Sequence, residues 1–189
     1  MPADADQAAT VALVTVDGEN TPVERLLAAI RPLVVRYCRA RMGGGQHSLV
    51  SPDDVAQEVC LAVLAALPAY QDQGRPFLAF VYGIAAHKVA DAHRAAARDR
   101  SEPVPELPER PAVDAEPETS ALSSELNGRL SRLLAMLPRQ QREVVILRVV
   151  TGLSTEETGA ALGMSPGSVR VTQHRALTRL RTLVAGMTD

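Results

Sequence analysis

The chain has 189 residues, of which 46% are hydrophobic, so it can build one domain or two small ones and is not disordered throughout. Its formal net charge of −2 does not indicate a nucleic-acid binder, but the charge is unevenly distributed. Residues 139–181 carry seven arginines against three glutamates, whereas residues 101–118 carry six acids and one arginine.

Targeting and membrane signals are missing from the sequence. The first twenty residues contain no Lys or Arg, so they do not resemble a signal or transit peptide. No apolar run is long enough to span a bilayer. The two cysteines, Cys38 and Cys60, form no CxxC pair and lie in apolar helical patterns, which is typical of small buried side chains. We therefore expect a cytoplasmic protein without membrane insertion.

The chain begins with a segment that has no periodic pattern. Residues 1–20 are acidic and rich in alanine, which predicts a disordered N-terminal tail. Thr21 and Glu24 then have the spacing of a capping box, and an apolar stripe of helical period follows them. Because Pro32 interrupts that stripe, we expect a kink or a break there.

A second helix should begin at Ser51 and Pro52, with an acidic and polar opening. Acids in a first turn offset the positive end of the helix dipole, and spacing alone favours this interpretation. The alternative is an edge that docks a partner. The polar residues in question are Asp53, Asp54, Gln57 and Glu58.

A third helix is predicted from about Pro76 to Arg98, and aromatic side chains gather at its start. Four of the five Phe and Tyr residues of the chain fall between Tyr70 and Tyr82, just before a basic stretch. Rings followed by a basic helix suit single-stranded nucleic acid, because bases stack on rings and phosphates meet cations. Rings that fill a small core would give the same pattern, and composition does not decide between the two.

Residues 99–120 hold five prolines among mostly acidic and small residues. This composition cannot build a core and predicts a flexible acidic linker. The linker divides the chain into two helical halves, residues 21–98 and residues 121–186, which we expect to move independently in the free chain.

The second half should contain four helices. Leucines at helical spacing predict one helix over residues 122–137, and residues 139–150 form another. A capping box begins a third at Ser154, Gly163 can end it, and Ser165 followed by proline begins a fourth. Two helices joined by so tight a turn predict a helix-turn-helix.

The last helix has an apolar stripe and a basic face. Arginine binds phosphates and can bridge guanine in the major groove, so this face is a candidate for reading DNA. An ordinary amphipathic helix with a solvated arginine face is the alternative. The two caps, the glycine and the basic second helix all agree with the DNA-binding interpretation.

At this point the sequence resembles a family. Residues 137–181, LPRQQREVVILRVVTGLSTEETGAALGMSPGSVRVTQHRALTRLR, look like region four of the extracytoplasmic-function (ECF) sigma factors of the sigma-70 family, and residues 53–94 look like region two. The stretch GRPFLAFVYGIAAHKVAD looks closest to the actinobacterial SigD/ShbA-like group. The resemblance implies an all-α protein of two small helical domains, region two over residues 21–98 and region four over residues 121–186.

The same resemblance implies a promoter-specificity subunit of bacterial RNA polymerase. Its partners would be core RNA polymerase, through the β′ clamp helices and the β flap, and promoter DNA. An anti-sigma factor is a further partner that the resemblance allows. The minus-ten element would be read as melted single strand and the minus-thirty-five element as duplex.

Site residues are carried over from the family position by position. The segment that would bind core polymerase is Asp53, Asp54, Gln57 and Glu58. The residues that would meet melted minus-ten DNA are Tyr70, Gln71, Asp72, Phe80, Tyr82, His87, Lys88 and Asp91. Those that would meet minus-thirty-five duplex are Ser165, Ser168, Arg170, Val171, Thr172, His174 and Arg175. The chain departs from the family pattern at Phe80, where tryptophan is common, at Ala86-His87, where Arg-Asn is common, and at Thr172, where a basic residue is common.

No catalytic pattern is present. The four histidines show no metal-ligand spacing with the cysteines, and neither a nucleophile motif nor a phosphate loop occurs. We therefore expect a protein that is not an enzyme and has no metal or cofactor. The competing function is a helix-turn-helix transcription factor that binds an operator by itself as a dimer, and an adaptor that binds only proteins is a third alternative.

Overall fold

The computed structural model describes residues 21–43, 50–99, 126 and 128–186. Within these ranges the chain consists of helices and the loops that join them, which confirms the predicted all-α fold. None of the described helices is long and apolar enough to cross a membrane. The tail predicted over residues 1–20 and the linker predicted over residues 99–120, apart from residue 99, lie outside the described residues.

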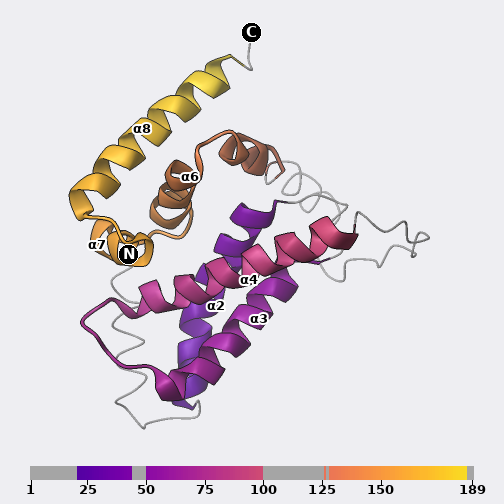
Figure 1. Ribbon diagram of the computed structural model, residues 1–189, viewed down its shortest axis with the longest axis vertical. Helices are drawn as coiled ribbons and strands as arrows, with labels where there is room; N and C mark the ends of the chain where they lie inside the picture. The colour runs from indigo at the N-terminus through magenta and orange to yellow at the C-terminus, as the bar shows by residue number, and fades with distance from the viewer. Residues whose placement is uncertain (1–20, 44–49, 100–125, 127, 187–189) are drawn as a thin grey trace.

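Three long helices form the first half of the molecule (Figure 1). They are α2 (Pro22–Met42), α3 (Pro52–Ala66) and α4 (Phe77–Asp99), and a short 3-10 turn, η1 (Leu67–Ala69), follows α3. Each of the three helices packs against the other two. Their shared core consists of fully buried aliphatic side chains, among them Ile30, Val34, Val59, Val63, Leu78 and Val81.

The first helix begins as predicted but is not broken. Thr21 Oγ1 accepts a hydrogen bond from the Glu24 amide (3.3 Å), and Glu24 Oε2 accepts one from the Thr21 amide (2.7 Å), which completes the capping box. The helix continues through Pro32, so the expected break is absent. Pro32 lies on the exposed side, while Ile30 and Val34 are anchored in the core and hold the helix together.

The second half contains a helix over residues 128–135, then α6 (Arg139–Val145), α7 (Thr155–Leu162) and α8 (Pro166–Ala185). The predicted helix over residues 139–150 changes its hydrogen bonding midway. From Ile146 to Val150 it is a π-helix, η2, in which the Thr151 amide donates to the carbonyl of Ile146 (3.0 Å). This wider turn is not visible in the hydrophobic pattern of the sequence.

The two halves pack against each other. Helix α7 lies on α4, and η2 lies on α2, so apolar residues such as Leu147 and Leu153 join the same core as Val34 (Figure 1). The two halves are therefore in contact in this structure, and independent movement in the free chain, which stays a prediction, requires this contact to open. Contact with the first half adds to the apolar surface that the second half buries, because residues of both halves share one core.

A polar cluster accompanies this apolar contact. The guanidinium of Arg41 lies 3.2 Å from the carboxylate of Glu143, and their side chains are only 12% and 13% exposed. The Tyr37 hydroxyl donates a hydrogen bond to the same carboxylate (3.4 Å). Arg41 and Tyr37 belong to α2 and Glu143 to α6, so the cluster ties the two halves together.

Candidate nucleic-acid and polymerase interface

The acidic opening of α3 lies on the surface. Asp53 pairs with Arg39 of α2 (2.9 Å), and Glu58 pairs with Lys88 of α4 (3.2 Å). These pairs are too exposed to contribute much stability. Asp54 and Gln57 are also exposed, and so is Leu61 one turn further along. The polar residues predicted for core polymerase therefore lie together on one accessible face of α3.

Three aromatic rings lie where the loop after η1 enters α4. The ring of Tyr70 lies 4.9 Å from that of Phe80 and 5.3 Å from that of Phe77. Phe77 is buried, whereas Tyr70 and Phe80 are only partly covered. One ring of the cluster therefore fills the core, and two rings remain partly accessible.

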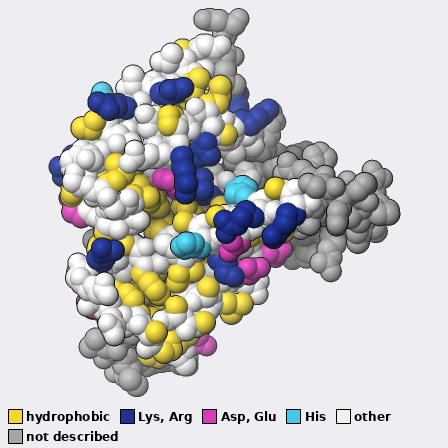
Figure 2. Space-filling view, in the orientation of Figure 1, with side chains coloured by type: hydrophobic (Ala, Val, Ile, Leu, Met, Phe, Trp, Pro, Cys, Tyr) yellow, Lys and Arg dark blue, Asp and Glu magenta, His cyan; other side chains and the backbone are white. Residues whose placement is uncertain are grey.

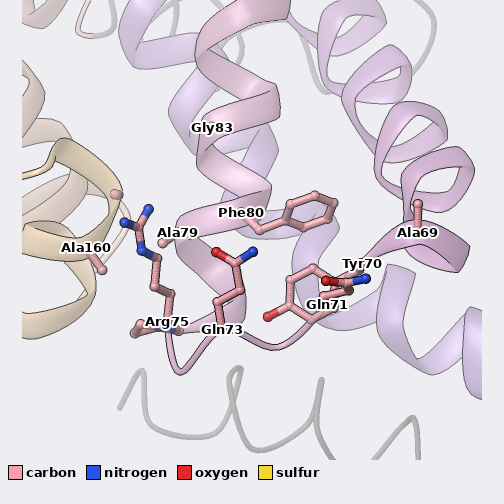
Figure 3. A pocket seen from close by; sticks show the side chains of 11 residues that line it. Ala69, Tyr70, Gln71, Gln73, Arg75, Ala79, Phe80, Gly83 and Ala160 are labelled. Carbon is pink, nitrogen blue, oxygen red and sulfur yellow. The ribbon is translucent and has the colours of Figure 1, made fainter.

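A cavity of about 450 Å³ opens beside the two accessible rings (Figure 3). Tyr70 and Gln71 line it, as predicted residues of the minus-ten site, together with Phe80 from α4. Asp72 does not line it. Its carboxylate accepts a hydrogen bond from the Gly74 amide (2.8 Å) and so holds the loop in shape.

Several residues that line this cavity are not among those predicted from the sequence. The side chains of Gln73 and Arg75 lie in it, as Figure 3 shows, and their position between two ring-bearing residues is the signal that could have found them. Ala160 and Ala161 of α7 line the opposite wall. No local signal predicts their contribution, because it depends on the packing of α7 against α4.

The remaining minus-ten candidates do not join this cavity. Tyr82 is 2% exposed and packs edge-on against Tyr37, with ring centroids 5.3 Å apart, and its burial raises its pKa to about 12. His87 and Asp91 are exposed further along α4, where Asp91 pairs with Arg94. Lys88 is half-buried and pairs with α3, as described above.

The helix-turn-helix forms as predicted and its geometry is tightly fixed. Ser154 Oγ accepts a hydrogen bond from the Glu157 amide (3.0 Å), and Ser165 Oγ accepts one from the Ser168 amide (3.2 Å). Gly163 takes the left-handed conformation, with φ of 65°. A Cβ on Gly159 would lie 2.6 Å from the carbonyl oxygen of residue 164, so only glycine allows this approach of the turn.

Helix α8 buries one face and exposes the other. Val169 and Ala176 are fully buried against the rest of the second half. The predicted duplex-reading residues Ser165, Ser168, Arg170, Val171, His174 and Arg175 are exposed, whereas Thr172 is half-buried. On the face drawn in Figure 2, Lys and Arg side chains are spread over the second half and acidic ones are few. The arrangement suits contact with a polyanion.

The described residues contain no group of three or more His, Cys, Asp or Glu side chains that could hold a metal ion. Cys38 and Cys60 are both buried, and burial raises the pKa of each thiol. Both cysteines are therefore small core residues, as the sequence indicates.

Two regions of the chain match known protein families. A family model described as Sigma-70 region 2 matches residues 26–99, and one described as Sigma-70, region 4 matches residues 127–180. The chain is 58% identical over 174 residues to ECF RNA polymerase sigma factor SigD of Mycobacterium tuberculosis, covering 92% of this chain and 82% of the relative. It is 53% identical over 175 residues to ECF RNA polymerase sigma factor ShbA of Streptomyces griseus, covering 89% and 90%.

Solved structures show the same fold. CnrH, in complex with the cytosolic domain of CnrY, aligns with a TM-score of 0.64 and 24% identity over 98% of this chain and 97% of that one. The sigma factor RpoE from Bartonella quintana, in complex with the anti-sigma factor NepR, aligns with a TM-score of 0.55 and 20% identity over 84% and 94%. With these similarities, the chain belongs to the ECF sigma factors of the sigma-70 family and to their SigD/ShbA-like group.

Proposed function

We propose that this ECF sigma factor binds core RNA polymerase and directs promoter-specific initiation by reading the minus-thirty-five element as duplex and the minus-ten element as melted single strand. The observation that carries this proposal is the presence of two DNA-compatible surfaces of different chemistry on one chain. One is the exposed basic face of α8, and the other is the ring-lined cavity at the start of α4.

The cavity fits an unstacked nucleobase. Tyr70 and Phe80 offer partly exposed rings on which a base can stack, and Gln71 and Gln73 offer amides that can pair with its edge. Arg75 at the rim can meet the phosphate that accompanies the base. A base flipped from the minus-ten element would thus be held by stacking, hydrogen bonds and charge. His87, Lys88 and Asp91 would lie along the strand that leads away from it.

Helix α8 fits the major groove of a duplex. Recognition helices contact base edges mostly from their N-terminal part, where Arg170 and Val171 are exposed. Arginine can bridge guanine, and an exposed valine can contact the methyl group of thymine. At the capped start of the helix, the exposed hydroxyl groups of Ser165 and Ser168 can donate hydrogen bonds to a phosphate. His174 and Arg175 follow one turn later, and Thr172 lies at the edge of this surface.

The exposed face of α3 fits a protein partner. We assign Asp53, Asp54, Gln57 and Glu58 to the β′ clamp helices of core polymerase, and region four to the β flap. Relatives in this family are sigma factors, which are initiation factors without catalysis of their own, so the phosphodiester chemistry belongs to the polymerase. We further propose that the protein acts in the cytoplasm, with an anti-sigma factor as a further candidate partner.

The proposal is tested by transcription in vitro with sigma-free core polymerase. We expect promoter-specific transcripts only when the chain is added, and weak, poorly selective DNA binding by the chain alone. The competing dimeric transcription factor would bind a symmetric duplex tightly by itself and would not support initiation. Tight operator binding by a dimer, together with no transcripts from core polymerase, would overturn the proposal.

A further inference from the structure

Helix α7 carries two adjacent glutamates that have different surroundings. Glu157 is buried and closes the capping box at Ser154. Glu156 points outward instead, and its carboxylate lies 3.6 Å from the guanidinium of Arg170 on α8. The side chains of Glu156 and Arg170 are 64% and 67% exposed, so the pair contributes little to the stability of the free chain.

The location of Glu156 is unfavourable for plain DNA affinity. Among the three glutamates of residues 139–181, Glu143 is largely covered between the halves and Glu157 is buried in its cap, so Glu156 is the exposed one. It lies beside the surface that faces a polyanion in the proposed function. A carboxylate there repels phosphates, which lowers affinity for every DNA sequence alike. A benefit elsewhere has to offset this loss of affinity for DNA.

The pair is held by a rigid frame. The backbone of the turn lies close to Gly159 of α7, and Ser165 caps the first turn of α8. These two features fix α7 relative to the start of α8. Further along, Arg148 Nε donates a hydrogen bond to Gln173 Oε1 (3.1 Å), which ties α8 to η2. The positions of the two helices therefore keep Glu156 close to Arg170, even though both side chains are exposed.

We propose that Glu156 is a positioning residue that directs Arg170 to a base edge. The inference rests on the proposed function, in which α8 reads duplex DNA. Contact with Glu156 restricts the long arginine side chain before binding and leaves the donors on its other edge free for guanine. The same carboxylate disfavours the competing placement of the guanidinium on a backbone phosphate. Glu156 thus lowers the affinity for DNA of any sequence and raises the selectivity at one base pair.

The test uses reconstituted holoenzyme and a promoter library randomised across the minus-thirty-five element. We expect Glu156→Ala to reduce the preference at the base pair read by Arg170 by about 3- to 10-fold, a part of the discrimination that a bidentate pair provides. We also expect it to increase transcription from promoters that carry a disfavoured pair there. Glu156→Gln, which keeps an oxygen acceptor but loses the charge, should give an intermediate result.

Two further variants separate positioning from simpler roles. Thr178→Lys adds one positive charge to an exposed site on α8 away from the pair, so it should raise overall affinity with the preference unchanged. In an Arg170→Ala background, Glu156→Ala should not change the preference further. If Glu156 only offset the dipole of α7, its loss would act equally in both backgrounds.

The outcome that overturns this inference differs from the one that overturns the proposed function. Holoenzyme with Glu156→Ala that initiates normally and keeps an unchanged sequence preference would show that Glu156 does not position Arg170. An equal loss of preference in the Arg170→Ala background would show the same. Failure of the wild-type chain to support any transcription would instead overturn the proposed function itself.

Discussion

The two halves of the molecule present their DNA-compatible surfaces in opposite ways. In the second half the outer face of α8 is open, and Arg170, Val171 and Arg175 are exposed. In the first half the ring-lined cavity has one wall made by Ala160 and Ala161 of α7, which belongs to the other half. In the proposed function, this arrangement leaves α8 open to duplex DNA, whereas a strand that enters the cavity has to share it with α7.

The difference originates in the contact between the halves. Tyr82 is covered there, and Arg41, Glu143 and Tyr37 form a polar cluster with little access to water. Breaking a buried pair by removing one partner is costly, because the other charge is left without compensation. The polar cluster therefore makes the closed arrangement specific, and the surrounding apolar residues supply its stability.

The largest effect should come from Glu143→Ala. This change leaves the Arg41 guanidinium buried and unpaired, at a cost of about 3–5 kcal/mol. Since that cost is relieved when the halves separate, we expect the chain to expand while its helix content persists. Small-angle scattering and circular dichroism measure the two quantities.

Glu156→Ala is the matched control for Glu143→Ala, because it removes an equal charge from an exposed site of the same half. It should leave the radius of gyration unchanged. A Glu143→Ala chain as compact as the wild type would contradict the importance of the polar cluster.

The next effect depends on pH. The pKa of Tyr82 is raised from 10.0 to about 12 by burial, and burial also raises that of Tyr37. A raised folded-state pKa of Tyr82 means that its neutral phenol stabilises the fold below pH 10, and this contribution is lost as the pH rises toward 12. The loss amounts to roughly 2–3 kcal/mol for Tyr82.

Urea denaturation at about pH 9 and about pH 11 measures about half of this loss, because pH 11 lies midway between the two pKa values of Tyr82. Tyr82→Phe removes one titrating group and should reduce the difference between the two conditions. If wild type and Tyr82→Phe lost the same stability over this range, Tyr82 would not be buried between the halves in solution.

Local features of this fold are predictable from sequence, whereas contacts between distant segments are not. The caps at Thr21 and Ser154 and the left-handed Gly163 were predicted correctly, because each depends on a few neighbouring residues. Of the kink or break expected at Pro32, the break is absent, since α2 continues through this residue. The π-helix from Ile146 likewise has no signal in the local pattern.

The same distinction between local features and long-range contacts applies to the candidate site. Tyr70, Gln71 and Phe80 were identified from the sequence and do line one cavity. The wall contributed by α7 was not foreseen, because it depends on packing across more than seventy residues of chain. Similarly, the contact of Glu156 with Arg170 depends on how α7 and α8 are placed, which the helix-turn-helix pattern fixes only in outline.

A smaller effect should follow from Phe80→Ala. Base stacking on a ring is worth about 1–3 kcal/mol per base, so loss of this ring should impair open-complex formation more than initial promoter binding. Permanganate footprinting of holoenzyme on promoter DNA measures melting directly. Phe77→Leu is the control, because it changes a buried ring of the same cluster that does not line the cavity. Normal melting by a folded Phe80→Ala chain would assign Phe80 to the core alone.

The smallest effect should come from the exposed face of α3. Asp54 and Glu58 are accessible to a partner, and each exposed charge pair contributes about 1 kcal/mol or less. The double change Asp54→Lys and Glu58→Lys should weaken assembly with core polymerase and make the remaining affinity less sensitive to salt, because it removes attraction and adds repulsion. Titration of labelled chain with core polymerase at two salt concentrations measures both.

The neutral pair Asp54→Asn and Glu58→Gln should have an affinity between those of the wild type and the reversed pair. The Ser51 cap is retained in every variant, so helix content should be constant. If the wild type and both double variants bound core polymerase with equal affinity, Asp54 and Glu58 would serve only to offset the dipole of α3. The acidic face of α3 would then not be a docking surface.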